Sequence, residues 1–189
     1  MTEDPSIGLG KAALAGGPAQ ALAFLGGRHL SYFRNGHVTR WLVSTGSALR
    51  AWLLASIQHS QPKFPVPAAL ATQVSECLTV LRKRLHGREA DQLHSLVQKL
   101  LSAAPELDMK RWMAAVDLTA DRVGFILGND LETASAVIKA SPADASVVGQ
   151  KERLKELYLY SVSESYLELR QKLGVSIDGW RWRWQLQVQ

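Results

Sequence analysis

Hydrophobic residues recur every three or four positions along most of this chain, a spacing typical of helices that bury one face. Val74, Leu78 and Leu81, for example, form such a stripe within a polar segment. Glycines and a proline-rich stretch, QPKFPVP, separate the stripes. The sequence therefore predicts a mainly α protein, an irregular bundle of about seven helices. The predicted helical segments are 18–36, 46–59, 70–85, 93–101, 108–128, 130–141 and 150–173.

Polar residues and glycines mark the ends of these helices. Asp108 and Asp130 each precede an apolar stripe and are expected to cap helix N-termini. Gly36 is expected to end the first helix. Gly26 and Gly27 lie inside that helix, where two glycines cost about 2 kcal/mol relative to alanine. They either break the helix or let another backbone come close. The last segment is expected to bury one face made of Leu154, Tyr158, Val162, Tyr166, Leu169 and Leu173.

The C-terminal residues WRWRWQLQV alternate instead of following a helical spacing. Trp180, Trp182 and Trp184 fall on one side, whereas Arg181 and Arg183 fall on the other. A period of two predicts a short extended strand with one buried face. Interleaved tryptophan and arginine also suit a membrane-active or nucleic-acid-stacking segment. A strand that lies across the bundle, or pairs with another chain, is favoured because the large apolar side chains need a surface to cover.

Length and composition are those of a single folded domain. The chain has 189 residues and a net charge of +5, which is compatible with an acidic partner without requiring one. Its single cysteine, Cys77, excludes a disulfide framework and a four-cysteine zinc site. The sequence divides into a flexible segment 1–17, a helical domain 18–174 and the strand 175–189. With no long apolar run and no secretory signal pattern, we expect a cytoplasmic protein that does not enter a membrane.

Two segments carry the residues that suggest chemistry, RHLSYFRNGH at 28–37 and DLTADRVG at 117–124. Together they resemble the gluzincin metallopeptidases of the HtpX-like class, whose motif H-E-x-x-H-x-x-x-G-H precedes a helix with E-x-x-A-D-R. Gly36 and His37 match the trailing Gly-His of the first motif. Ala120, Asp121, Arg122 and Gly124 match the second motif. The resemblance implies a helical core that was built around a zinc ion.

The zinc ligands themselves are replaced. Against the family motif, Arg28 stands at the first histidine, His29 at the general-base glutamate and Tyr32 at the second histidine. Asp117 stands at the glutamate ligand, and only Asp121, which the motif uses outside the metal shell, is kept. Arginine stays protonated and has no lone pair for zinc. We therefore expect no metal, no cofactor and no catalysis.

A cluster of ion pairs is the predicted substitute for the metal. Arg28 and Tyr32 are four residues apart on one helix, and Asp117 and Asp121 are four apart on another. Two carboxylates at that spacing repel each other unless a cation lies opposite them, and a guanidinium group could supply it. Alternatively, the two pairs face solvent separately. The candidate site comprises Arg28, His29, Tyr32, His37, Asp117 and Asp121.

These observations favour a non-catalytic helical module for protein interaction or scaffolding, which binds a protein partner or associates with itself. The alternative is a nucleic-acid-binding protein that uses the basic cluster Arg82–Arg84 and the Trp/Arg tail. A second alternative is a divergent active hydrolase, which would need a metal ion. Oligonucleotide binding that weakens steeply as salt rises would favour the nucleic-acid-binding alternative. Metal analysis of the purified protein would test the hydrolase alternative.

Overall fold

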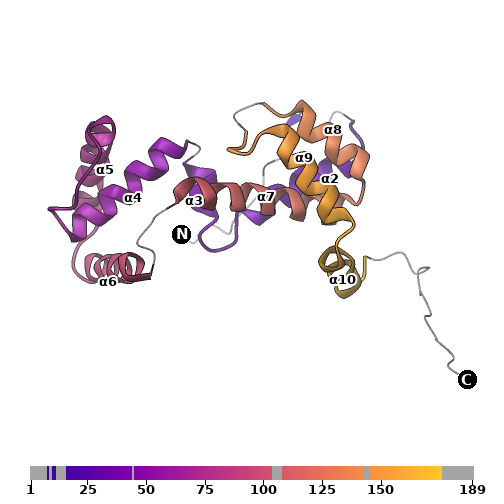
Figure 1. Ribbon diagram of the computed structural model, residues 1–189. Helices are drawn as coiled ribbons and strands as arrows, with labels where there is room; N and C mark the ends of the chain where they lie inside the picture. The colour runs from indigo at the N-terminus through magenta and orange to yellow at the C-terminus, as the bar shows by residue number, and fades with distance from the viewer. Residues whose placement is uncertain are drawn as a thin grey trace, which may run out of the picture.

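The computed structural model describes residues 8, 10, 11, 16–43, 45–103, 108–142 and 145–175. These residues form nine α-helices and one short 3-10 helix, and no strand occurs among them (Figure 1). The prediction of a mainly α protein is confirmed. The elements are α2 (Ala19–Ser31), α3 (Val38–Leu42), α4 (Gly46–Ser60), η1 (Ala68–Leu70), α5 (Ala71–Arg84), α6 (Arg88–Ala103), α7 (Met109–Gly128), α8 (Leu131–Ala140), α9 (Gln150–Ser161) and α10 (Glu164–Lys172).

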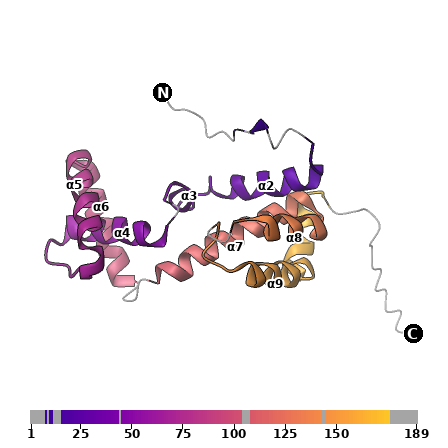
Figure 2. The same ribbon diagram turned by 90° about the horizontal axis from the view of Figure 1, so that it is seen from above.

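The helices gather into two groups joined by the long helix α7 (Figures 1 and 2). In one group, α5 and α6 pack against α4. In the other, α2, α8 and α9 pack against α7, and α10 follows α9. The N-terminal part of α7 reaches α4, where the buried side chain of Met113 lies close to Gly46. Helix α7 is therefore the element that both groups share.

Each group has its own apolar cluster. Phe24, Phe125 and Leu157 are buried together where α2, α7, α8 and α9 meet. Leu54 and Val74 belong to a second cluster between α4 and α5. Both clusters come from the three- and four-residue spacing of hydrophobic positions that the sequence displays, because that spacing places apolar side chains on one face of each helix.

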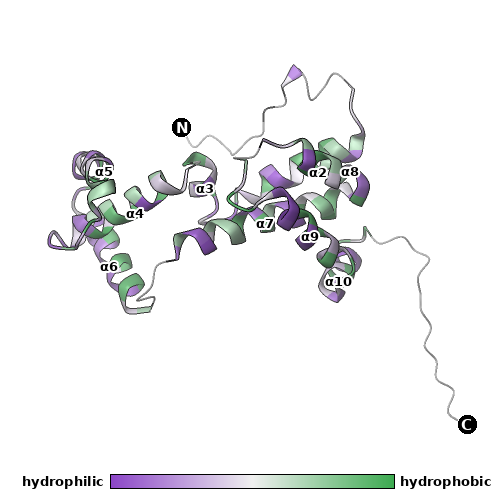
Figure 3. Cartoon of the chain, turned by 45° about the horizontal axis from the view of Figure 1, so that its top comes forward, coloured by the Kyte–Doolittle hydropathy of each residue, from purple (hydrophilic) through white to green (hydrophobic). Residues whose placement is uncertain are grey.

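Helices α5 and α6 leave most of their apolar stripes only partly covered. Val74 is the one buried residue of α5, and Val97 is the one buried residue of α6. Leu96 on α6 is exposed, and Figure 3 shows hydrophobic bands along this helix. Cys77 is half-buried against the α4–α5 cluster. Burial, together with the charge of nearby Glu76, raises the pKa of its thiol.

Helices α2 and α7 approach each other closely through glycines. A Cβ atom added to Gly27 would lie 2.8 Å from the Cα of Gly124. Further along the pair, a Cβ added to Gly128 would lie 3.0 Å from the carbonyl oxygen of Gln20. Gly26, by contrast, faces open space. The glycine doublet therefore does not break α2. Of the two readings of the doublet, close approach of another backbone is the one observed, and Gly27 provides it.

Two elements differ from the sequence expectation of about seven helices. Helix α3 lies between two predicted segments, after a turn in which Gly36 has a φ of 87°. Because α2 already ends at Ser31, Gly36 does not cap it, contrary to the prediction. The segment 150–173 is split at Ser163, whose Oγ accepts a hydrogen bond from Tyr166 N at 3.3 Å and starts α10. The predicted single buried face of 150–173 is wrong because the helix is interrupted at Ser163 and because α9 buries Arg153 and Leu157 instead of the predicted residues. Four of its members are exposed: Tyr158, Val162, Leu169 and Leu173.

The remaining predictions fall on the ends of the chain. Most of the segment 1–17 and all residues from 176 onward lie outside the described residues, including the tail Trp180–Trp184. The flexible N-terminal segment and the C-terminal strand therefore stay predictions. Among the described helices, none combines the length and the apolar character needed to cross a membrane.

Candidate functional site

Helix α7 carries two buried carboxylates one turn apart. Asp117 and Asp121 are 0% and 1% exposed. The helix begins as predicted at Asp108, whose Oδ1 accepts a hydrogen bond from Arg111 N at 2.9 Å. Buried carboxylates are costly unless paired, and two on adjacent turns also repel each other. Each of them therefore needs a counter-charge from another element.

Two arginines from different helices bind Asp121. Arg153 of α9 donates from Nε to Oδ2 and from Nη2 to Oδ1, both at 2.8 Å. The Nη1 atom of Arg28 on α2 lies 2.9 Å from Oδ1. The side chain of Arg153 is 1% exposed and that of Arg28 10%. One carboxylate thus links α2, α7 and α9 through two guanidinium groups, and the contact with Arg153 is bidentate.

Asp117 binds a different set of partners. Arg40 of α3 donates from Nη2 to Oδ2 at 3.1 Å, and its Nε lies 3.1 Å from Oδ1. Ser146 Oγ and Val147 N also donate to Oδ2, at 2.7 and 2.9 Å. Ser146 and Val147 lie between α8 and α9. Asp117 therefore holds both α3 and this connecting segment against α7.

The sequence-predicted site residues are only partly brought together. Arg28 forms its ion pair with Asp121, whereas Asp117 is matched by Arg40. The other three predicted residues are not members of these ion pairs. His29 is exposed, and its ring centroid lies 6.3 Å from that of Tyr32 in an edge-to-face arrangement. His37 is half-buried, and its buried Nδ1 has no hydrogen-bond partner among the residues that the structure describes.

Three residues whose side chains bind the two aspartates were not predicted from the sequence. Arg40, Ser146 and Arg153 lie in segments that no motif singles out. The hydrogen bonds of Arg40 and Arg153 to the aspartates span 77 and 32 residues of chain. No sequence signal marks Arg153, because its burial next to Leu157, one turn later on α9, is seen only in the structure. We use the name ion-pair cluster for Arg28, Arg40, Asp117, Asp121 and Arg153.

The chemistry open to the ion-pair cluster follows from its charges. Among the residues that the structure describes, the guanidinium groups of Arg28, Arg40 and Arg153 lie against the two carboxylates. Guanidinium groups stay protonated and cannot ligate a metal, and the carboxylates are already occupied by them. Within the described ranges, no group of three or more His, Cys, Asp or Glu side chains is placed to hold a metal ion. The cluster is suited to fixing the positions of α2, α3 and α9 on α7.

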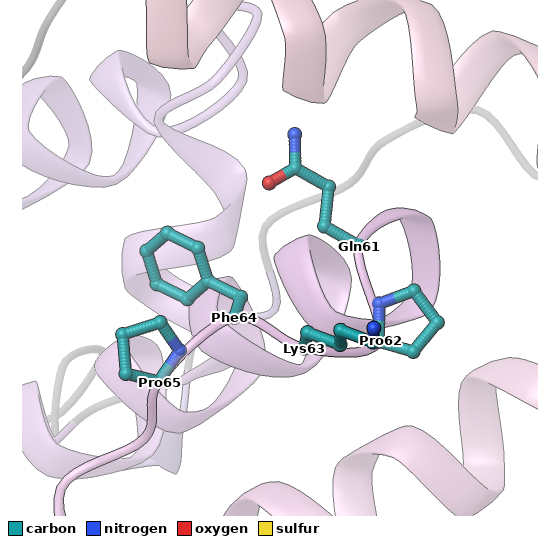
Figure 4. A pocket seen from close by; sticks show the side chains of 5 residues that line it. All are labelled: Gln61, Pro62, Lys63, Phe64 and Pro65. Carbon is teal, nitrogen blue, oxygen red and sulfur yellow. The ribbon is translucent and has the colours of Figure 1, made fainter.

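A hollow of about 500 Å³ lies beside the connection between α4 and η1, away from the ion-pair cluster. Five consecutive residues, 61–65, line it, and Figure 4 shows the rings of Phe64 and Pro65 next to each other. The carbonyl of Phe64 accepts a hydrogen bond from Gln58 Nε2 at 3.1 Å, which fixes the turn. Among the described lining residues, Lys63 alone has a titratable side chain. The hollow therefore lacks the convergent polar groups of a catalytic pocket.

Comparison of the chain with protein-family models, with curated proteins and with solved structures finds no match.

Proposed function

We propose that this chain is a non-catalytic helical module for protein interaction or scaffolding. In this proposal the ion-pair cluster stands where the HtpX-like core that the sequence resembles holds its zinc ion. Support comes from the occupancy of the two carboxylates. Asp121 accepts three contacts from Arg28 and Arg153, and Asp117 is engaged by Arg40. Neither carboxylate is left as a general base or as a metal ligand.

The observation that carries the proposal is the inverted pattern of α3. This five-residue helix buries its charged residue, Arg40, and exposes its apolar ones. Trp41 and Leu42 are 57% and 67% exposed, and Val38 is exposed as well. Val38 lies three and four residues before Trp41 and Leu42, so all three share one side of the helix. We call Val38, Trp41 and Leu42 the α3 surface.

The α3 surface has the character of an interaction site. Exposed tryptophan and leucine side chains fixed next to each other favour binding to another protein, and tryptophan is enriched among residues that dominate such binding. The buried pair Arg40–Asp117 holds the helix in place. A rigid support lowers the entropy that binding would otherwise cost. In this view the ion-pair cluster positions a surface rather than a reacting group.

The experiment compares three forms of the protein. Trp41→Ala/Leu42→Ser changes the α3 surface, and Leu96→Ser changes an exposed apolar residue of α6 as the matched control. Self-association is measured by analytical ultracentrifugation, and binding of partner proteins by quantitative affinity capture. We expect the α3 variant to lose at least tenfold in association while the control keeps it, with unchanged urea unfolding of both. The proposal would be overturned if the wild type and both variants associated equally. It would also be overturned if the protein hydrolysed peptides and Asp121→Asn abolished that activity.

Nucleic-acid binding is a second candidate because Arg82, Lys83 and Arg84 are all exposed in the last turn of α5. Basic residues also interact favourably with the dipole at a helix C-terminus, which explains the trio without any ligand. Binding of a mixed-sequence oligonucleotide should then weaken steeply as salt rises, because phosphate contacts release counterions. Neutralising these three residues should reduce that slope.

A further inference from the structure

A second surface with a distinct composition lies between α8 and α9. It is a hollow of about 650 Å³ to which Lys139 of α8 and several residues of α9 contribute. Three of its described lining residues are lysines, and none of those described carries a carboxylate. Its apolar lining consists of Leu154, Leu159 and the ring of Tyr158. We call this hollow the α8–α9 groove; it is lined by Lys139, Gln150, Lys151, Leu154, Lys155, Tyr158 and Leu159.

The walls of the groove are held by specific hydrogen bonds. Gln150 Nε2 donates to the carbonyl oxygen of Ser141 at 2.8 Å and to that of Lys139 at 3.3 Å. The start of α9 is thereby attached to the end of α8. At the other end, Tyr158 Oη lies 3.2 Å from Ser135 Oγ on α8, which fixes the tyrosine ring. The groove is thus a preformed surface, which is the condition for binding at low entropic cost.

Charge and apolar character change along the exposed side of α9. Lys151, Lys155, Leu159 and Val162 follow one another at intervals of four, four and three residues, so they lie along one face. The first two are cationic and the last two are apolar and more than half exposed. Glu152 pairs with Lys155 at 3.5 Å, and both side chains of this pair are largely exposed. Such a pair contributes little and leaves the lysine able to bind another anion.

We infer that the α8–α9 groove binds an acidic amphipathic helix of a partner protein. Carboxylates at one end of that helix would face Lys139, Lys151 and Lys155, and leucine-like side chains at the other end would cover Leu159 and Val162. Aliphatic side chains on a groove surface are typical of helix-in-groove binding. A nucleic-acid strand is disfavoured because its phosphates would lie over the apolar half of this face. The inference rests on the proposed interaction function but uses a different surface.

The test uses a fluorescein-labelled helical peptide of 18 residues with glutamates in its first half and leucines at three- and four-residue spacing in its second half. Binding is measured by fluorescence anisotropy at low salt and at physiological salt. Lys151→Gln/Lys155→Gln should weaken binding about tenfold and flatten its salt dependence, because two screened charge contacts are removed. Leu159→Ser should weaken binding without changing the salt dependence. Lys83→Gln/Lys99→Gln, which removes equal charge from α5 and α6, should leave binding unchanged.

Three results would overturn the inference. The first is no peptide binding at low salt, and the second is equal binding by the groove variants and the wild type. The third is tighter, groove-dependent binding of an oligothymidine or of phosphatidylserine vesicles than of the peptide, which would assign the groove to a nucleic acid or to a lipid surface. Trp41→Ala/Leu42→Ser separates the two proposals, since it should leave peptide binding intact. If the wild-type protein does not bind the peptide but still shows association that depends on the α3 surface, the groove inference fails and the proposed function stands.

Discussion

Replacing Asp121 should destabilise the protein more than replacing either arginine that binds it. In Asp121→Asn, the guanidinium groups of Arg28 and Arg153 remain close together without their anion, and both are at least nine-tenths buried. Breaking a buried pair by removing one partner costs about 3–5 kcal/mol. Because two cations lose the same anion here, we expect the upper end, about 5 kcal/mol.

The two arginines should differ from each other. Arg153→Met removes two hydrogen bonds of 2.8 Å and leaves Asp121 with Arg28, so we expect a loss of about 3 kcal/mol. Arg28→Met leaves the bidentate contact between Arg153 and Asp121 intact. It removes one 2.9 Å contact to Asp121 Oδ1, so its expected cost is smaller, about 2 kcal/mol. The predicted order of destabilisation is Asp121→Asn, then Arg153→Met, then Arg28→Met.

Urea unfolding followed by circular dichroism at pH 7 measures these free energies by linear extrapolation. The double variant Asp121→Asn/Arg28→Met should be more stable than the sum of the single effects predicts, by about 1–3 kcal/mol, because removing one guanidinium group relieves the repulsion left by the other. Additivity within about 0.5 kcal/mol would show that Arg28 and Asp121 do not interact. A cost for Arg28→Met equal to that for Asp121→Asn would refute the charge argument.

Further predictions concern the helix crossing, the caps and metal. Gly27→Ala should lower the free energy of unfolding by about 1–3 kcal/mol because its Cβ would meet the α7 backbone. Gly26 faces open space, so Gly26→Ala should raise the free energy of unfolding by up to about 1 kcal/mol. Urea unfolding that shifts in the same direction for both variants would contradict this. Hydrogen bonds from Thr133 lower the pKa of Asp130, so the carboxylate stabilises the fold above the ordinary pKa and loses this effect as the pH falls through the lowered one. The difference in melting temperature between wild type and Asp130→Ala should therefore be largest at neutral pH and vanish in acid. Purified protein should contain no stoichiometric zinc, and a chelator should leave its melting temperature unchanged; metal analysis near one equivalent would contradict this.

Periodicity and capping chemistry are local, which is why much of the helix map follows from the sequence. Asp108 and Asp130 cap α7 and α8 where expected, since an N-cap needs only its own next three residues. The split between α9 and α10 was missed because Ser163 sits within an unbroken apolar spacing. There the side chain of Ser163 competes with the helix for backbone N–H groups. The spacing of Leu154, Tyr158 and Val162 carries no information about that competition.

The two aspartates of the site could be predicted from the sequence, whereas two of the arginines that bind them could not. Asp117 and Asp121 lie four residues apart on a predicted helix, so the sequence alone indicates a pair that needs a cation. The cation that pairs with each carboxylate is decided by how distant segments of the chain pack. Arg40 and Arg153 have no neighbours in sequence that distinguish them from exposed arginines, yet both are buried. Long-range ion pairs of this kind are set by tertiary packing.

The glycines and the ion-pair cluster depend on each other. A Cβ added to Gly124 would lie 2.9 Å from the Cγ of Arg28, so the arginine stem runs across the place where a side chain would stand. Only with Gly124 can the guanidinium group reach Asp121, one turn earlier on α7. Ala120 is 0% exposed. Ala120, Asp121 and Gly124 are the buried positions that match the metallopeptidase-like motif, and the roles of Asp121 and Gly124 follow from the packing of α2, α7 and α9. The spacing D-x-x-x-D-x-x-G on α7 is therefore accounted for by the way three helices are held together.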